Sequence, residues 1–360
     1  MKQLDRYIIA KYLKTFLFTA LLFTIIAVAI DYSDKISKVI EHDLTFIEVL
    51  RFRYFSYIPW INGELWPLFA LIAVIFVASR LAGNSEVIAI LGSGVSFSRY
   101  LQPFLVSALL LSVTYGIARH LILPKSNQTY RYYEAKYFWP REEKVMNNDI
   151  HIFLDPDSKI YVRSFRKSDT TLLNVRLETI QDKKLVQLIK SKKATWIGEP
   201  NRWRLQDPSY REIVEGKESI RFAKTKLDTA FNLHPKDFVK YNSQREMMTT
   251  PELLDYIDYE EAKGVGNTRS FKIEIYRRTS DPFTMIILTI IGTCIASRKK
   301  RGGIGVNLAI GVSLGAMYIV LSKFSQTFAS NSSLHPILGV WLPNAIFSVV
   351  ALISYLTAQK

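Results

Sequence analysis

Hydrophobic and polar positions divide the chain into two apolar regions that flank one long polar block. Each apolar region contains three apolar stretches. A helix that crosses a bilayer needs about 20 mostly apolar residues, because it must span about 30 Å of hydrocarbon at about 1.5 Å per residue. The pattern therefore predicts six membrane-spanning helices, with one large insertion after the third. The stretches are residues 15–30, 58–78, 101–117, 283–296, 304–321 and 337–356.

The first and fourth stretches depart from the simple pattern. The fourth is short, so we expect its helix to begin earlier, near Ile275. The first follows several basic residues, as a signal peptide would. Its apolar run is long and no small-residue cleavage pattern follows it, so we interpret it as an uncleaved helix. Six such runs, with basic and aromatic residues at their ends, disfavour buried helices of a soluble protein.

The polar block has the pattern of a β domain. Short runs of apolar and β-branched residues recur, separated by turn signals such as the Asp-Pro-Asp-Ser of residues 155–158. Strands at this spacing are typical of a sandwich, barrel or jelly roll. The predicted strands are residues 151–154, 159–165, 173–179, 185–191, 194–197, 203–207 and 219–225.

These patterns predict an α-helical membrane protein with six transmembrane helices plus an inserted all-β, jelly-roll-like domain. A helix is expected after the strands, because Thr249 and Thr250 precede Pro251 and Glu252, a common helix start. The expected domains are residues 1–123 with the first three spans and a short helix at about 84–94, residues 124–248 with the β domain, residues 249–274 with the return helix and linker, and residues 275–360 with the last three spans.

Charge gives the predicted orientation. Short loops rich in Lys and Arg face the cytoplasm. The N-terminal segment is basic, and residues 298–301 are four consecutive basic residues on the same side. Both termini are therefore predicted to be cytoplasmic and the β domain to be outside, which is the periplasm for the inner membrane of a Gram-negative bacterium. The same bias also fits an organelle membrane of a eukaryote.

The motif search gives no positive sign of an enzyme. The sequence has no Walker A motif, no G-x-S-x-G and no metal-binding His spacing, and Cys294 is its single cysteine. We predict no catalytic residue, no metal and no cofactor in this chain. The β block carries a little over half of the net charge of +15. Outside the cytoplasm, that charge fits anionic lipid head groups better than nucleic acid.

Three polar residues near the membrane are candidate lipid contacts. Lys35 and Lys38 follow the first stretch, where solvated loop charge is the simpler interpretation. Glu64 lies inside the second stretch, where an ionisable side chain is costly and usually faces a cavity or a partner. The alternative is that Glu64 lies near the head groups, at an interfacial start of the helix.

The loop after the second stretch contains the strongest candidate site. Residues 84–94 form a short helix pattern that starts at Asn and Ser and ends at Gly, with an apolar stripe that a simple connector does not need. Such a helix suits docking into another protein, although it also fits a helix lying on the membrane. Because the chain lacks an ATP site, we favour docking to an ATPase through Ser85, Glu86 and Val87.

The chain resembles the LptF/LptG permease family of the lipopolysaccharide export machine. The resemblance rests on Leu-Asp-Arg-Tyr-Ile at residues 4–8, on residues 85–94 from Ser-Glu-Val to Gly-Ser-Gly, and on the six-span plan with its β insertion and return helix. It covers essentially the whole length, and the Leu-Asp-Arg-Tyr opening resembles LptG more than LptF.

The resemblance implies an ABC-type export complex. Two permease chains, one LptF and one LptG, would pair on an LptB-like ATPase dimer that hydrolyses the ATP. They would extract lipopolysaccharide from the membrane lipids and pass it to a β-jelly-roll bridge through LptC and an LptA-like protein. Glu86 would contact the ATPase, while Lys35 and Lys38 match the family's basic residues only approximately. Asp31 stands where an LptG-like chain is expected to have Lys.

Two other functions remain open from the sequence. One is a permease of another lipid or lipoprotein ABC exporter, and the other is a membrane-anchored periplasmic assembly protein without a transport role. Lipids that purify with the complex discriminate the first. Substitution of Glu86 discriminates the second.

Overall fold

The computed structural model consists of two compact units, which are described separately. The helical unit comprises residues 1–138, 245–253 and 269–360, and the β unit comprises residues 139–244 and 254–268. The structure describes residues 3–138, 143–145, 149–181, 184–214, 217–222, 226–241, 244–262, 268–298, 303–331 and 334–358. The predicted basic residues 299–301 and the predicted glycine-rich end of the return helix, residues 264–266, lie outside these ranges.

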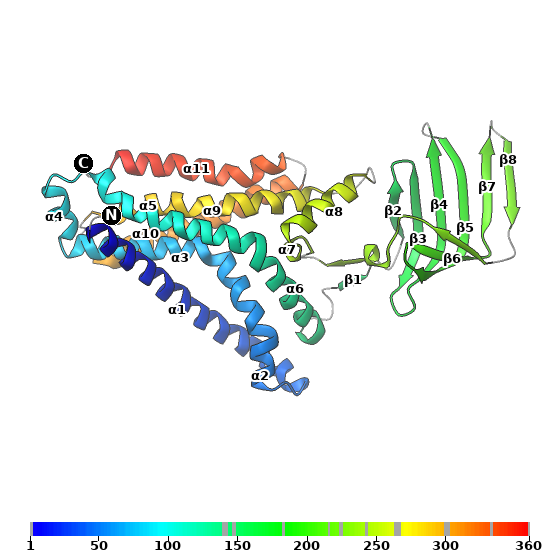
Figure 1. The fold of residues 1–360 in the computed structure, drawn as a ribbon, viewed down its shortest axis with the longest axis horizontal. Helices are drawn as coiled ribbons and strands as arrows, with labels where there is room; N and C mark the ends of the chain where they lie inside the picture. The colour runs from blue at the N-terminus through cyan, green and yellow to red at the C-terminus, as the bar shows by residue number, and fades with distance from the viewer. Residues whose placement is uncertain are drawn as a thin grey trace. The chain divides into compact units, whose positions relative to one another are not determined.

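Within the described residues, the helical unit contains six helical segments that are long and apolar enough to cross a membrane, which confirms that prediction. Both chain ends and the short helix α4 lie at one end of this unit, here called the α4 end (Figure 1). The opposite end of the helical unit, where α6 and α7 lie, is here called the far end (Figure 1). The elements are α1 Gln3–Glu41, α2 Phe46–Glu48, η1 Val49–Tyr54, α3 Phe55–Gly83, α4 Glu86–Gly92, α5 Phe97–Ile117, η2 Ala118–Ile122, α6 Leu123–Tyr133, η3 Glu134–Phe138, α7 Gln244–Met247, α9 Arg269–Ala296, α10 Gly303–Ser330 and α11 Pro336–Leu356.

Helices α3 and α9 form the centre of this bundle. The share of buried residues in the apolar segment is 61% for both helices, but only 22% for α10 and 11% for α1. Glycine permits the close packing: a Cβ at Gly292 of α9 would lie 2.6 Å from Cγ1 of Val74 in α3, and a Cβ at Gly311 of α10 would collide with Ile75. Small residues at such crossings bring membrane helices together.

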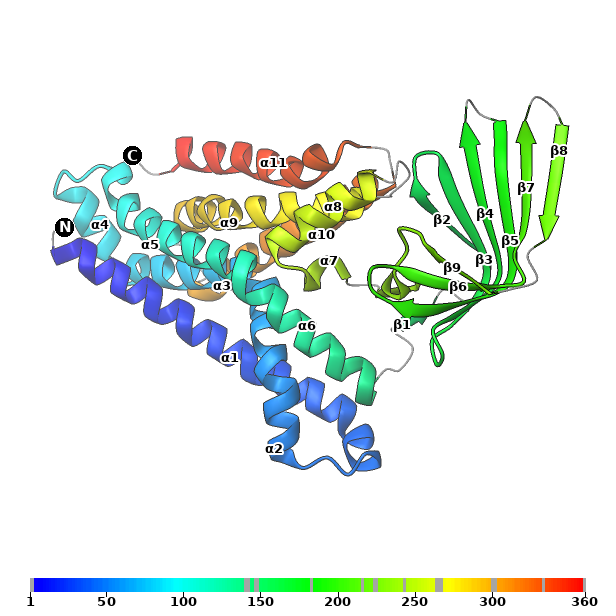
Figure 2. The ribbon, with the colours of Figure 1, turned by 45° about the vertical axis from the view of Figure 1, so that its right-hand side comes forward.

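Two helices extend beyond their predicted bounds. The third span continues without a break through η2, α6 and η3 to Phe138, so the predicted domain boundary between residues 123 and 124 falls inside it (Figure 2). Asn127 and Tyr130 are buried in this polar extension and hold it to the bundle. Helix α9 begins at Arg269, ahead of the predicted Ile275, because its charged residues find partners within the helical unit.

In its described residues, the β unit is built on an antiparallel sheet of eight strands, which confirms the inserted all-β domain. Its order is β2-β3-β4-β5-β6-β9, and β7 pairs with both β5 and β8. A separate pair joins β1 and β10. The strands are β1 Glu143–Val145, β2 Ile150–Asp155, β3 Ser158–Arg166, β4 Thr171–Gln181, β5 Lys184–Gly198, β6 Arg202–Gln206, β7 Ser209–Val214, β8 Lys217–Phe222, β9 Leu227–Ala230 and β10 Val239–Tyr241, and the 3-10 turn η5 spans Pro235–Phe238.

One apolar core holds the sheet together. Val162 of β3 lies opposite Val175 of β4, and both are buried with Trp203 of β6. The indole nitrogen of Trp203 donates to the carbonyl oxygen of Leu233 at 2.9 Å, as a buried polar group requires. Two predicted strands, residues 185–191 and 194–197, are one continuous strand, β5. Helix α8, Thr250–Ala262, follows the strands as the return helix.

Candidate functional site

The α4 end displays Glu86 at the start of a short helix. Ser85 precedes the helix in the left-handed region, with a φ of 61°, and turns the chain sharply after α3. Glu86 accepts hydrogen bonds from the Tyr7 hydroxyl at 3.0 Å and from Nδ2 of Asn84 at 3.1 Å. Nζ of Lys11 lies 3.7 Å away from its carboxylate. Glu86 is thus tied to the first turns of α1 while remaining half-exposed.

The apolar stripe of α4 has an inner and an outer side. Val87 is only 1% exposed and belongs to the main core of the bundle, whereas Ile88 is 56% exposed. Ile90 and Leu91 are half-buried against the same core. Val87 therefore anchors α4 to its own bundle, so it is not displayed for a direct contact. Ile88, Ser85 and Glu86 form the displayed part.

At the far end, Lys35 belongs to a cluster of paired charges that we call the Asp31 cluster: Asp31, Lys35, Arg53 and Glu134. Arg53 donates to both carboxylate oxygens of Asp31, at 3.0 and 2.9 Å. Lys35 lies 3.0 Å from Asp31 and 2.9 Å from Glu134. Asp31, found where the family resemblance predicted Lys, thus joins α1 to η1. Lys38 donates to the carbonyl oxygen of Phe138.

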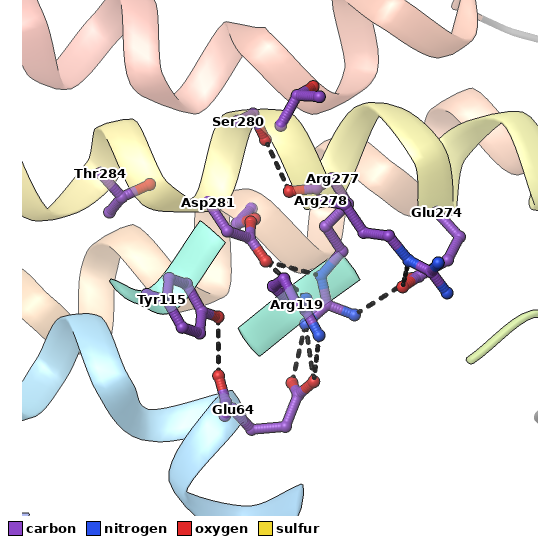
Figure 3. A network of polar contacts seen from close by, with 12 residues as sticks. Glu64, Tyr115, Arg119, Glu274, Arg277, Arg278, Ser280, Asp281 and Thr284 are labelled. Carbon is purple, nitrogen blue, oxygen red and sulfur yellow. Dashed lines mark hydrogen bonds and ion pairs between the residues drawn. The ribbon is translucent and has the colours of Figure 1, made fainter. Parts of the chain in front are cut away.

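A second cluster surrounds Glu64 and is shown in Figure 3; we call it the Glu64 network. Both carboxylate oxygens of Glu64 accept from Nη2 of Arg277, at 2.9 and 2.8 Å, and Arg119 lies 3.5 Å away. Arg119 also donates to Asp281 at 2.6 Å. Of the two interpretations of Glu64, these ion pairs favour a partnered side chain within the bundle.

Helix α9 supplies most of the Glu64 network from one face. Glu274, Arg277, Arg278 and Asp281 are spaced three and four residues apart, which places them side by side on a helix. Arg278 pairs with Glu274 at 3.2 Å, and Nε of Arg277 lies 3.3 Å from Asp281. Buried charges are retained only when they are paired in this way.

A pocket opens beside this network, between α3, α9 and α10. It has an empty volume of about 560 Å³, including space open to solvent. Glu64, Arg277 and Asp281 line one side, and Leu68 and Leu288 supply apolar wall. Lys323 lines it as well, is largely exposed, and its Nζ lies 4.0 Å from Glu64.

The π-helical turns η1, η2 and η3 carry key members of both clusters. Arg53 lies in η1, Arg119 in η2 and Glu134 in η3, and all three side chains are buried. The widened turn of a π-helix is often found at functional sites. Each π-helical turn in these long helices therefore carries one buried charged side chain.

Sequence reasoning selected Glu64 and Lys35 but missed their partners. Arg53 and Glu134 belong to parts of the chain that meet α1 only after folding. The charged face of α9 could have been predicted from the sequence, because its charged residues recur at helical spacing: Glu274, Arg277, Arg278 and Asp281. The hydrogen bond between Tyr7 and Glu86 could not have been predicted, because the two residues are far apart in the sequence.

Six membrane-length helices with an inserted antiparallel β domain, found within the described residues, define a polytopic membrane protein. The chain belongs to the lipopolysaccharide export system permease LptF/LptG family, whose model matches residues 6–357. It is 18% identical over 352 residues to the lipopolysaccharide export system permease protein LptG of Escherichia coli (strain K12), covering 97% of this chain and 96% of that protein. LptG of Escherichia coli O6:H1 (strain CFT073) matches equally. These matches confirm the predicted family, with the resemblance on the LptG side, and support a multi-pass protein of the inner membrane.

Proposed function

We propose that this chain is the permease subunit of a complex that extracts lipopolysaccharide from the inner membrane, driven by a separate ATPase dimer that docks on α4. The observation that carries the proposal is the two-sided construction of α4. Val87 fixes the helix to the bundle, while Ser85, Glu86 and Ile88 are displayed. The family membership and the lack of a Walker A motif in the sequence support an external ATPase.

Docking at α4 would reach the membrane helices by two routes. A displacement of α4 passes through Val87 into the core formed by α3 and α5. A cation of the ATPase that binds Glu86 competes with Lys11 and Tyr7, and so changes the hold of α4 on α1. ATP drives transport in this scheme only if the ATPase binds the two states of the permease with different affinity.

The second permease, LptF or LptG, would pair through the least buried spans. Helices α1 and α10 expose long rows of apolar side chains, such as Leu21 and Ile25 on α1 and Val320 and Phe324 on α10. A partner chain and the acyl chains of the lipid both suit such surfaces. The inserted β unit would then lie in the periplasm and pass the lipid to LptC and an LptA-like bridge, with both termini in the cytoplasm.

Lys35, Lys38 and Glu64 remain candidate lipid contacts. A lipid would have to compete with the partners that these side chains already have. Lys35 is already paired with Asp31 and Glu134, so a lipid phosphate must compete with two carboxylates for it. Lys323, exposed at the pocket beside Glu64, needs less rearrangement to reach a phosphate. We therefore expect lipid to exchange for existing ion pairs at the far end.

The test reverses the charge of Glu86 in the assembled complex. Glu86→Lys is expected to abolish co-purification of the ATPase and lipopolysaccharide export. The substitution replaces the carboxylate that should bind a cation of the ATPase by a cation that repels it. Asp255→Lys makes the same charge change on an exposed position of α8 and should leave both unchanged. If Glu86→Lys retains the ATPase and full export, the docking proposal is wrong. Mass spectrometry of the co-purified lipid distinguishes lipopolysaccharide from the cargo of another exporter.

A further inference from the structure

The chain passes between the helical unit and the β unit at four points, after residues 138, 244, 253 and 268, and the segments beside the first two points are held by buried arginines. The exit segment, residues 134–138, is η3, and the return segment, residues 245–250, contains most of α7 and the first residue of α8. Both segments belong to the helical unit. Arg53 and Arg278 are among the largest fully buried side chains of the protein.

Arg278 of α9 holds the return segment through its backbone. Its Nη2 donates to the carbonyl oxygens of Met248 at 2.8 Å and of Arg245 at 3.2 Å. Nη1 donates to the Thr250 hydroxyl at 3.0 Å. Carbonyl groups at the end of a short helix have no partner within it, and a buried guanidinium supplies one.

Two further side chains complete this socket from the third span. Nδ2 of Asn127 in α6 donates to the carbonyl oxygen of Glu246 at 3.1 Å. Nδ1 of His120 in η2 lies 2.8 Å from the Thr250 hydroxyl. Since that hydroxyl accepts from Arg278, its own hydrogen is available for a neutral His120. We define the return socket as Arg278, His120, Asn127 and Thr250.

The exit segment is held by a different set of helices. Lys38 of α1 donates to the carbonyl oxygen of Phe138, and Lys35 pairs with Glu134 at 2.9 Å. The guanidinium of Arg53 in η1 lies 4.4 Å from the ring centre of Phe138. The exit segment continues the third span and is bonded to α1 and η1 by its side-chain contacts, whereas the return segment is bonded to α9, η2 and α6.

The helices that hold the exit and return segments differ in how deeply they are buried. Helix α9 is among the most buried spans and α1 is the least buried. A movement of α1 against α9 acts on both segments, because the exit segment is bonded to α1 and the return segment is bonded to α9. A loose connection would absorb that movement within its own residues.

We propose that the return socket is a positioning device: it makes residues 245–250 move as one body with α9, so that movement between α1 and α9 reaches the inserted β unit. Thr250 and Arg278 act by positioning the connection and need not touch the lipid. The transport consequence rests on the proposed function, whereas the rigidity of the socket does not.

The test uses a matched pair of variants at Thr250 in the full-length chain. Thr250→Val keeps the shape and removes the hydroxyl that links Arg278 to His120, and Thr250→Ser keeps the hydroxyl. Amide hydrogen exchange at residues 245–250 is expected to rise about tenfold in Thr250→Val, the order of magnitude for losing one buried hydrogen-bond hub. It should remain near the parent value in Thr250→Ser and within α9 of both variants. Equal amide exchange in the two variants would contradict the claim that the Thr250 hydroxyl holds residues 245–250 rigid.

The transport consequence is read in the complex with its ATPase and lipopolysaccharide. In the complex with Thr250→Val, the ATPase is expected to hydrolyse ATP at the parent rate, while cross-linking of lipopolysaccharide to the β unit falls several-fold. Thr250→Ser should restore the cross-linking. Raised exchange with unchanged cross-linking would mean that the socket only stabilises structure, and would overturn the positioning role. Loss of ATPase association in Glu86→Lys concerns the docking proposal alone, so the two failures are distinguishable.

Discussion

The two ends of the helical unit use charge in opposite ways. At the α4 end, Glu86 is half-exposed, and its contacts to Tyr7, Asn84 and Lys11 lie at the surface. At the far end, Arg53, Arg119 and Arg278 are buried, and each has at least two partners in the described residues. Exposed pairs contribute about 0–1 kcal/mol and exchange readily, whereas breaking a buried pair costs about 3–5 kcal/mol. The α4 end is therefore suited to exchanging partners, and the far end to keeping them.

The largest expected effect comes from breaking the far end. Arg119→Met keeps much of the side-chain volume but removes the cation beside Asp281 and Glu64, so we expect a loss of stability of about 3–5 kcal/mol. Thermal unfolding in detergent measures it. Glu86→Ala at the α4 end should cost less than about 1 kcal/mol. Similar losses for the two variants would contradict the contrast between the ends.

A second effect tests the packing that connects the two ends. Gly292→Ala inserts a Cβ 2.6 Å from Cγ1 of Val74, and overpacking of this kind costs about 1–3 kcal/mol. Gly305→Ala in α10 is the matched control, because no atom lies within 4 Å of its Cβ. Unfolding temperatures should fall for Gly292→Ala alone. An equal response at the two glycines would show that α9 does not pack tightly on α3.

A smaller effect depends on pH. Burial, together with the charge of Glu274, raises the pKa of Glu246 above its usual range. A raised pKa in the folded state means that stability is present below the unfolded pKa and is lost as pH rises through the folded pKa. Glu246→Gln should therefore unfold at a higher temperature than the parent at pH 8, and the difference should vanish near pH 4. A constant difference across this range would contradict the raised pKa of Glu246.

Much of the fold follows from the sequence because it depends on local pattern. Six apolar stretches and alternating strands are visible without tertiary knowledge. Strands β1, β7, β9 and β10 escaped prediction. Strands β1, β9 and β10 span only three or four residues, and β7 shows no clear alternation of buried and exposed positions. The end of the third span was missed because Asn127 and Tyr130 look like loop residues until the bundle buries them.

The candidate sites were less predictable, for a physical reason. Glu86 was selected because its loop contains an apolar stripe that a simple connector does not need. Such a stripe is visible in the local sequence. Lys35 was selected as a free cation, but folding brings Glu134 to it from the third span. Its availability to a ligand depends on that distant partner, which no local pattern reveals. The role of Val87 likewise changed from displayed to anchoring once its burial was known.

The central claim, that an ATPase docks on the outer side of α4, has a direct test. A photo-cross-linking residue at Ile88, which is exposed on α4, is compared with one at Leu110, which is exposed on α5 within the third span. We expect a cross-link between position 88 and the ATPase and none between position 110 and the ATPase. Absence of the ATPase from the products at position 88, in a complex that still exports lipopolysaccharide, would contradict it.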